Sequence, residues 1–162
     1  MKTPARPTTL AATLALATLL AAGAPSRARA EGAEQAKAPA ATLTIDAAGF
    51  RNDRGRAMVA VFSQKAGFPD EDQKALRTAS GAIANGKVQI LVADLPPGAY
   101  AVCVYHDENA NQKLDTDWLG RPKEGMGASN DAKGHRGPPK FDDAKFTLEA
   151  GGKTIAVTIA YP

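Results

Sequence analysis

Short apolar runs, each closed by a turn signal, constrain the fold of this chain more than any other feature. Alternating apolar residues, typical of strands with one buried face, occur at 42–47 and 154–160. The run at 57–62 is apolar on both faces, as in a central strand, and 99–106 is rich in Tyr and Val, which favour strands. Further short strands are expected at 78–84, 87–93 and 146–148. About seven strands with frequent turns predict an all-β fold, an antiparallel β-sandwich of the transthyretin-like or immunoglobulin-like kind, with a closed barrel as the alternative.

The turn residues between these runs predict local geometry. Asn85-Gly86 lies between two runs and predicts a hairpin, because both central residues must tolerate positive φ. The stretch 68–72, a Phe-Pro pair followed by acids, favours a short helical turn. The apolar strand positions predict one buried core, formed by Ile45, Val59, Val61, Ile90, Val92, Val102, Val104, Phe146, Ile155 and Val157.

The first thirty residues predict export. Lys2 and Arg6 precede an apolar run at 10–24, and Ala28-Arg29-Ala30 forms a small-x-small site, the three parts of a signal peptide. The run is shorter than the ~20 residues that a membrane span needs, although an uncleaved anchor is the alternative. We therefore expect a signal peptide at 1–30, a flexible lead-in at 31–40 and one β-sandwich domain at 41–162, with no membrane span after signal removal. The expected location is periplasmic or secreted.

The charge distribution argues against a nucleic-acid partner. The chain has 20 Lys and Arg, 17 Asp and Glu, and a formal net charge of +3. Four of the basic residues lie in the first thirty, which contain no acid, so the remainder has 16 basic against 17 acidic residues. No basic tract is left to follow a phosphate backbone. The partner is expected to be an envelope ligand or protein of unknown identity.

The segment 107–140 has no clear strand or helix pattern. Loops longer than about 12–15 residues without secondary structure are uncommon and are usually functional or disordered. This one contains Trp118, Leu114, Leu119 and Met126 among many glycines and prolines, a composition unlike that of disordered chains. We therefore expect one long ordered loop that Trp118 holds against the sandwich.

The first part of this loop has the spacing of a calcium site. Side-chain oxygens recur at every second position, and a backbone carbonyl falls where a calcium loop uses one; the expected ligands are Asp107, Asn109, Asn111, the carbonyl of Lys113, and Asp115. Two positions depart from the calcium pattern: Gln112 stands where Gly is expected and Trp118 where a bidentate Glu is expected. The alternative is an Asx-rich turn whose side chains bond their own backbone. The sequence leaves both readings open, so calcium is the one cofactor that it suggests.

Catalytic chemistry has weaker support. If the protein is an enzyme, the candidate acids and bases are His106, Asp107 and Asp115. The same three residues together with His135 are the candidate ligands of a transition metal. The single Cys103 lies in an apolar run and is expected to be a buried structural residue. No phosphate-binding loop, dinucleotide fingerprint or nucleophile elbow occurs in the sequence.

The order of the motifs resembles one bacterial family. Over residues 43–161 the chain is similar to the family known as domain of unknown function 2141, most specifically in DLPPGAYAV, HDENANQKLDTDWLG and FDDAKF. The resemblance implies a secreted or periplasmic β-sandwich and no established activity. The loop of that family usually reads closer to DENGNG, whereas this chain has Ala110 and Gln112 at the glycine positions.

Three functions are compatible with these features. The first is a non-catalytic exported module that binds a ligand or partner through the 107–140 loop, because loops on a rigid scaffold commonly carry recognition. The second is a periplasmic enzyme that uses His106, Asp107 and Asp115. The third is a structural envelope protein that pairs with a partner through an exposed strand edge.

Overall fold

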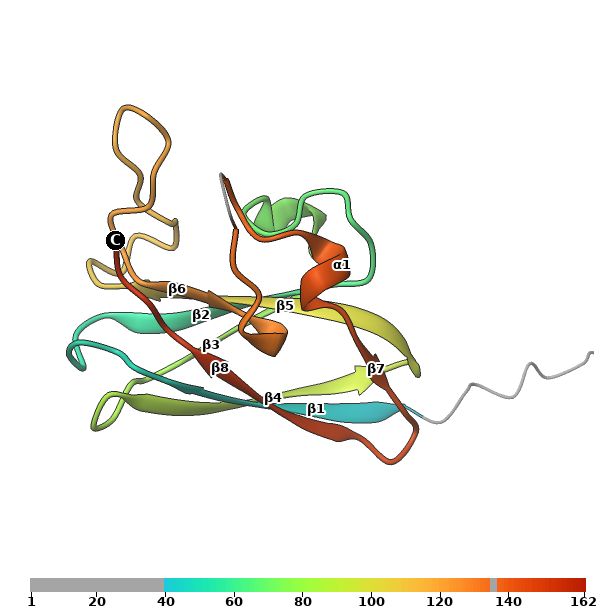
Figure 1. The fold of residues 1–162 in the computed structure, drawn as a ribbon. Helices are drawn as coiled ribbons and strands as arrows, with labels where there is room; N and C mark the ends of the chain where they lie inside the picture. The colour runs from blue at the N-terminus through green and yellow to red at the C-terminus, as the bar shows by residue number, and fades with distance from the viewer. Residues whose placement is uncertain (1–39, 135–136) are drawn as a thin grey trace, which may run out of the picture. The chain divides into compact units, whose positions relative to one another are not determined.

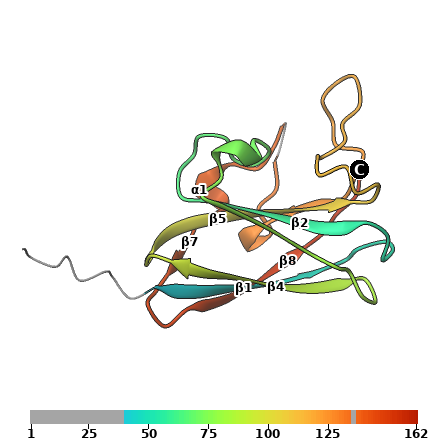
Figure 2. The ribbon, with the colours of Figure 1, turned by 180° about the vertical axis from the view of Figure 1, so that it is seen from behind.

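The computed structural model describes residues 40–134 and 137–162, and the strands within them form two sheets that face each other (Figures 1 and 2). One sheet has the order β4-β1-β8, and the other has the order β3-β2-β5-β6, with β7 pairing a different part of β5. The strands are β1 (Ala41–Ala48), β2 (Arg56–Phe62), β3 (Arg77–Gly81), β4 (Lys87–Leu95), β5 (Gly98–Asp107), β6 (Met126–Ala128), β7 (Phe146–Leu148) and β8 (Lys153–Thr158). The all-β sandwich predicted from the sequence is confirmed. The expected signal peptide and nearly all of the lead-in lie outside the described residues.

Helical structure is limited to three short elements: η1 (Asp72–Lys74), η2 (Ser129–Asp131) and α1 (Phe141–Ala144). The helical turn expected at 68–72 is therefore displaced: it is a single 3-10 turn that begins at Asp72. Within residues 40–134 and 137–162, we find no helix with the length and apolar character to cross a membrane.

The core between the sheets is the one that strand alternation predicts. All ten expected core residues are buried and belong to one apolar cluster. Val102 and Val104 on β5 pair with Val61 and Val59 on β2, so the two central strands supply its middle.

The outer face of the five-stranded sheet is also covered, which explains why β2 is apolar on both faces. Phe62 and Cys103 are buried there. Phe68 from the β2–β3 loop packs edge-to-face against Phe62 and Phe141. In Figures 1 and 2, the β2–β3 loop and α1 lie on this outer side, and the loop after β5 rises beyond the end of the sheet. This side of the sandwich therefore carries the loops of the candidate site.

Two pairings differ from the sequence prediction. β1 and β8 are parallel, although the other strand pairs are antiparallel, because the chain reaches β8 through β7 on the opposite sheet. Asn85 and Gly86 both have positive φ, as a hairpin turn requires, yet β3 pairs with β2 while β4 pairs with β1. The turn thus joins the two sheets, and its strands separate after the Ala84–Lys87 bridge.

The segment 107–140 is not one continuous loop. It contains β6, which pairs with β5, and the turn η2. Ser129 is fully buried there; its Oγ accepts the Val102 N–H at 2.9 Å and donates to the Ala144 carbonyl at 2.6 Å. The strand was missed because Met126-Gly127-Ala128 is too short to show alternation.

Candidate functional site

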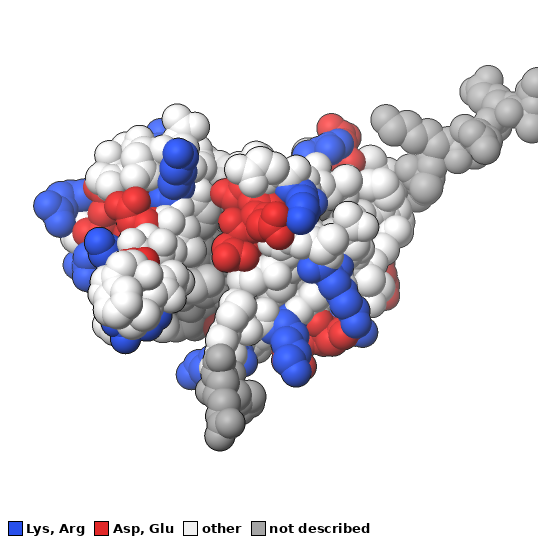
Figure 3. Space-filling view, turned by 90° about the horizontal axis from the view of Figure 1, so that it is seen from above, with Lys and Arg blue, Asp and Glu red and all other residues white. Residues whose placement is uncertain are grey.

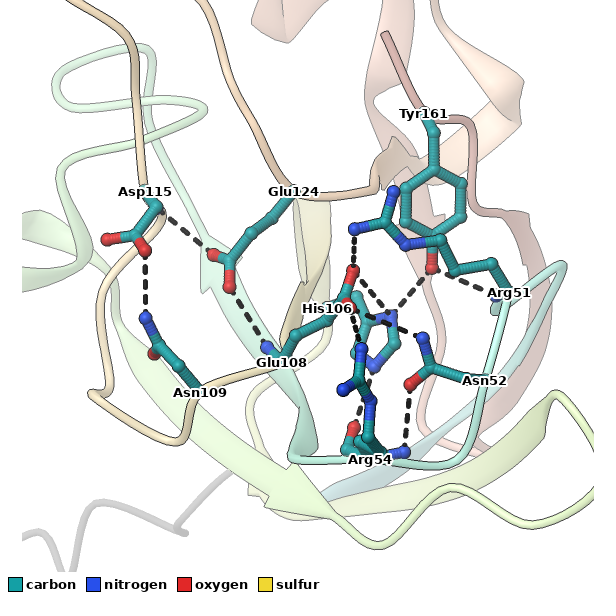
Figure 4. A network of polar contacts seen from close by, with 9 residues as sticks. All are labelled: Arg51, Asn52, Arg54, His106, Glu108, Asn109, Asp115, Glu124 and Tyr161. Atoms are coloured by element: carbon teal, nitrogen blue, oxygen red, sulfur yellow. Dashed lines mark hydrogen bonds and ion pairs between the residues drawn. The ribbon is translucent and has the colours of Figure 1, made fainter.

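The end of β5 meets the β1–β2 turn and the C-terminal Tyr161 in one polar network (Figure 4). His106 is fully buried at this junction. Its Nε2 lies 2.8 Å from the Arg54 carbonyl and its Nδ1 lies 2.6 Å from the Tyr161 hydroxyl. A carbonyl only accepts, so Nε2 carries a proton, and in the neutral tautomer this leaves Nδ1 to accept from the Tyr161 hydroxyl. Both ring nitrogens are therefore used by the fold.

Glu108 is the acidic member of the same network. Its carboxylate accepts from the Asn52 amide at 3.2 Å and from Arg54 at 3.3 Å, and it forms an ion pair with Arg51. Partial burial acts to raise the pKa of Glu108, but the Asn52 and Arg51 contacts outweigh it and hold the pKa below its usual value. Arg51 also stacks over the Tyr161 ring, 4.7 Å from its centroid. The network joins the β1–β2 turn, the end of β5 and Tyr161, and its acid and base side chains are paired within it.

The loop after β5 is organised by Asp107. This side chain is fully buried, and its two oxygens accept the N–H groups of Asn111 at 3.0 Å and Gln112 at 2.7 Å. Asn109 and Asn111 continue the pattern, since each side-chain oxygen accepts the N–H two residues further along. The backbone is left-handed at Ala110 (φ 58°) and Gln112 (φ 63°), and the bonds to Asp107 and Asn109 stabilise that curl.

Asp115 closes this turn from the other side. Its two oxygens accept the amide N–H groups of Asn109 at 2.8 Å and Asn111 at 3.0 Å. The side chains expected to hold calcium are thus brought together, but their oxygens are engaged within the turn. Among the described residues, no group of three or more His, Cys, Asp or Glu has the geometry to hold a metal ion. His135, the other histidine of the transition-metal reading, lies outside the described residues.

Glu124 ties the two ends of the loop together, and the sequence did not single it out. It is 5% exposed, and its oxygens accept the N–H of Glu108 at 2.9 Å and the N–H of Asp115 at 3.0 Å. The available sequence signal was a single acid next to Gly125-Met126-Gly127. Glutamate is rarely buried unless it is hydrogen-bonded, so the sequence contained no direct indication that Glu124 is buried. Its contacts depend on two segments distant in sequence, so spacing alone could not predict them.

The three acid and base candidates do not form a common site. His106 and Asp107 are fully buried and bonded as described, and the Asp115 oxygens bond two amides. None of the three lines the pocket that the neighbouring loops form. Their arrangement stabilises the end of the sandwich and the turn.

That pocket lies between the loop after β5 and the β2–β3 loop, over the outer face of β5. It has a volume of about 190 Å³. Its walls are Pro69, Asp70, Asp72 and Gln73 on one side and Gln112, Lys113, Leu114 and Thr116 on the other, and its floor is formed by Cys103 and Tyr105. Figure 3, which views this side of the molecule, shows a compact acidic patch near its middle. The pocket is the concave feature that the two loops create together.

Burial raises the pKa values of three ionisable side chains that line the pocket. The Tyr105 hydroxyl donates to the Asp72 carboxylate at 3.1 Å. Burial raises the pKa of Asp72, the Tyr105 bond opposes that effect, and Asp70 adds to it. Burial and the negative charge of Asp72 also raise the pKa of Tyr105, and burial raises the pKa of the Cys103 thiol to about 12. Cys103 is therefore buried and protonated, as expected from the sequence.

Trp118 does not hold the loop against the sandwich. Its side chain is 89% exposed, and the neighbouring Leu119 is 55% exposed. The anchoring expected of it is done by Asp107 and Glu124, whose carboxylates bond the loop backbone. Polar bonds, and not apolar packing, therefore order this segment.

Comparison with known proteins identifies the family. A family model described as an uncharacterized protein conserved in bacteria (DUF2141) matches residues 45–156. The chain belongs to the DUF2141 family. Searches of curated proteins and of solved structures gave no match. The matched region of the DUF2141 chain includes both sheets, the pocket and the Asx-rich turn, while Tyr161 lies beyond it.

Two residues of the turn, Ala110 and Gln112, have a left-handed backbone although neither is glycine. The DENGNG pattern given above with the family resemblance would have glycines at these two positions. Both positions have positive φ here, a conformation that glycine adopts without steric cost.

Proposed function

We propose that this chain is an exported, non-catalytic binding module that recognises a small ligand through the pocket beside the loop after β5. The observation that carries the proposal is the pocket itself, whose 112–116 wall is held in place by the buried carboxylates of Asp107 and Glu124. A preorganised wall lowers the entropy that binding must overcome. The side chains of His106, Asp107 and Asp115 are hydrogen-bonded within the fold, and this supports a role without catalysis. Export rests on the predicted signal peptide.

The chemistry of the pocket favours a ligand with a positively charged or hydrogen-bond-donating group. Two acids, Asp70 and Asp72, line it together with one cation, Lys113, and within the described residues neither carboxylate forms a salt bridge. Asp72 is half-buried beside the Tyr105 hydroxyl, where an incoming cation would restore the solvation that its carboxylate lacks. A small organic cation is therefore the ligand class that we expect.

The test is a thermal-shift measurement with putrescine, spermidine and L-arginine as probes. A probe that binds only the folded protein must raise the melting temperature by mass action. Asp72→Asn should remove the shift, and the matched control Asp94→Asn should keep it, because Asp94 lies on β4 outside the pocket. Binding should also weaken as the pH falls through the raised pKa of Asp72. A shift that Asp72→Asn leaves unchanged would place binding elsewhere.

Calcium binding by the Asx-rich turn is a second proposal. It is favoured by the convergence of Asp107, Asn109, Asn111 and Asp115 in one turn. An ion would have to displace the bonds that Asn109 and Asn111 donate to Asp115, and the carbonyl of Lys113 would complete the set. The role proposed for calcium is stabilisation of the pocket wall.

A further inference from the structure

The strongest unexplained feature is the end of the loop after β5, residues 115–123, which we call the Trp118 tip. Trp118 and Leu119 are adjacent and expose 89% and 55% of their surfaces. In Figure 1 this loop projects beyond the sheets, next to the C-terminus. Exposed large apolar side chains that are adjacent and projecting mark interaction sites more often than isolated ones do.

The tip is held rigid by Asp117. One of its carboxylate oxygens accepts the N–H groups of Leu119 and Arg121, both at 2.9 Å, and the other accepts from the Arg121 side chain at 2.8 Å. The backbone adds bonds from Gly120 to the Asp117 carbonyl and from Asp117 to the Arg121 carbonyl. The N–H groups of 117, 119, 120 and 121 are thus satisfied inside the tip. These bonds lower the cost of moving that part of the backbone out of bulk water.

The charges around the tip are arranged with the cations outward. Lys113, Arg121 and Lys123 are exposed, whereas Asp115 and Asp117 are half-buried and use their oxygens for bonds within the loop. Figure 3 shows Lys and Arg along the edges of the lobe on the left, uncharged surface over part of it, and a smaller area of Asp and Glu between them. Apolar residues at an apex with cations around them complement a surface that has an apolar interior and anionic groups above it.

We propose that the Trp118 tip inserts into the headgroup region of an anionic phospholipid surface. Trp is favoured at membrane interfaces because its ring is apolar with one polar N–H, and Leu119 beside it adds apolar area. Lys113 and Lys123 would contact the lipid phosphates, in accord with the attraction of basic residues to anionic leaflets, while Arg121 stays paired with Asp117 inside the tip. The convex shape favours a lipid surface over a protein groove, which would have to enclose the tip. This inference goes beyond the proposed function, because it uses the apex of the loop and not the pocket.

The experiment uses the single Trp of the chain as its own reporter. The mature protein is mixed with vesicles of phosphatidylcholine alone or with added phosphatidylglycerol, and Trp emission and co-sedimentation are measured. We expect a blue shift, quenching by brominated lipid and sedimentation with the anionic vesicles, each reduced by about 0.5 M salt because salt screens charge attraction. An unchanged emission with protein left in the supernatant would overturn the proposal and leave a protein groove as the occupant.

Variants locate the contact. Leu119→Ala should weaken anionic-vesicle binding several-fold while keeping the reporter, and Lys123→Gln should weaken it and reduce its salt dependence. Leu91→Ala is the matched control, since Leu91 is 62% exposed on β4 of the other sheet, and it should bind like the wild type. Equal losses in the Leu119 and Leu91 variants would overturn the assignment. Asp72→Asn should leave vesicle binding intact, so this inference and the proposed pocket can fail separately.

Discussion

At the scale of the residue, Val102 tests the placement of the central strand. Its side chain is fully buried on β5 opposite Val61 of β2. Val102→Ala should lower the free energy of unfolding by about 1–3 kcal/mol, through lost transfer energy and the cavity that remains. Urea denaturation measures this loss. The exposed control Leu91→Ala should change stability by less than about 0.5 kcal/mol, and equal effects would mean that Val102 is not a core residue.

Asp53 is a residue whose charge stabilises the turn between the sheets. Its carboxylate accepts the N–H groups of Gly86 at 2.8 Å and Asn85 at 2.9 Å, and these bonds hold its pKa below the usual 3.8. A lowered folded-state pKa stabilises the fold above the unfolded pKa, and this stability is lost as pH falls through the folded value. Asp53→Asn should therefore flatten the pH dependence of urea unfolding below about pH 4. The control Asp94→Asn should retain the wild-type slope there; if Asp53→Asn retains it too, the linkage is absent.

At the scale of the element, the order of the Asx-rich turn has two candidate causes: hydrogen bonds to its own backbone, or a bound calcium ion. In the structure its oxygens bond the turn's own backbone, so Asp107→Ala should lower stability by about 1–3 kcal/mol as the N–H groups of Asn111 and Gln112 lose their acceptor. Chemical denaturation with and without a chelator measures this. With self-bonding alone the chelator has no effect on the wild type. A wild-type melting temperature that falls on chelation and recovers with calcium would instead show that an ion organises the turn.

Hydrogen exchange tests the order of the whole loop. The amides of Glu108 and Asp115 both bond the buried Glu124 carboxylate, so both should exchange slowly. Glu124→Gln removes one charged acceptor, and it should speed exchange at one or both amides while leaving the β1 amides protected. Fast exchange of both amides in the wild type would contradict an ordered loop.

Elements differed in how far the sequence could predict them. The Asn85-Gly86 turn was predicted because the need for positive φ is local, and the structure has it at both residues. The Asx pattern was predicted for the same reason, since its bonds span only a few residues. The role of Glu124 was not predicted, because its partners Glu108 and Asp115 lie on another part of the loop and no spacing rule links them.

At the scale of the whole molecule, export gives the remaining prediction. The Ala28-Arg29-Ala30 site predicts that the mature chain begins at Glu31. N-terminal sequencing of the protein recovered outside the cytoplasm should therefore read Glu31-Gly32-Ala33. A sequence that begins at Met1 would contradict cleavage.

Residue order was enough to predict every strand except β6, together with the core and the local turns. Strand alternation depends on neighbouring side chains, so Ile45, Val59 and Val102 could be placed in the core before any pairing was known. Tertiary structure alone decided the parallel pairing of β1 with β8, the burial of His106 against Tyr161 and the exposure of Trp118. Each of these depends on segments that meet only after the chain has crossed between sheets. Apolar residues in a loop follow no periodic pattern that would predict whether they are buried or exposed. The position of Trp118 therefore depends on the hydrogen bonds of Asp107, Asp117 and Glu124.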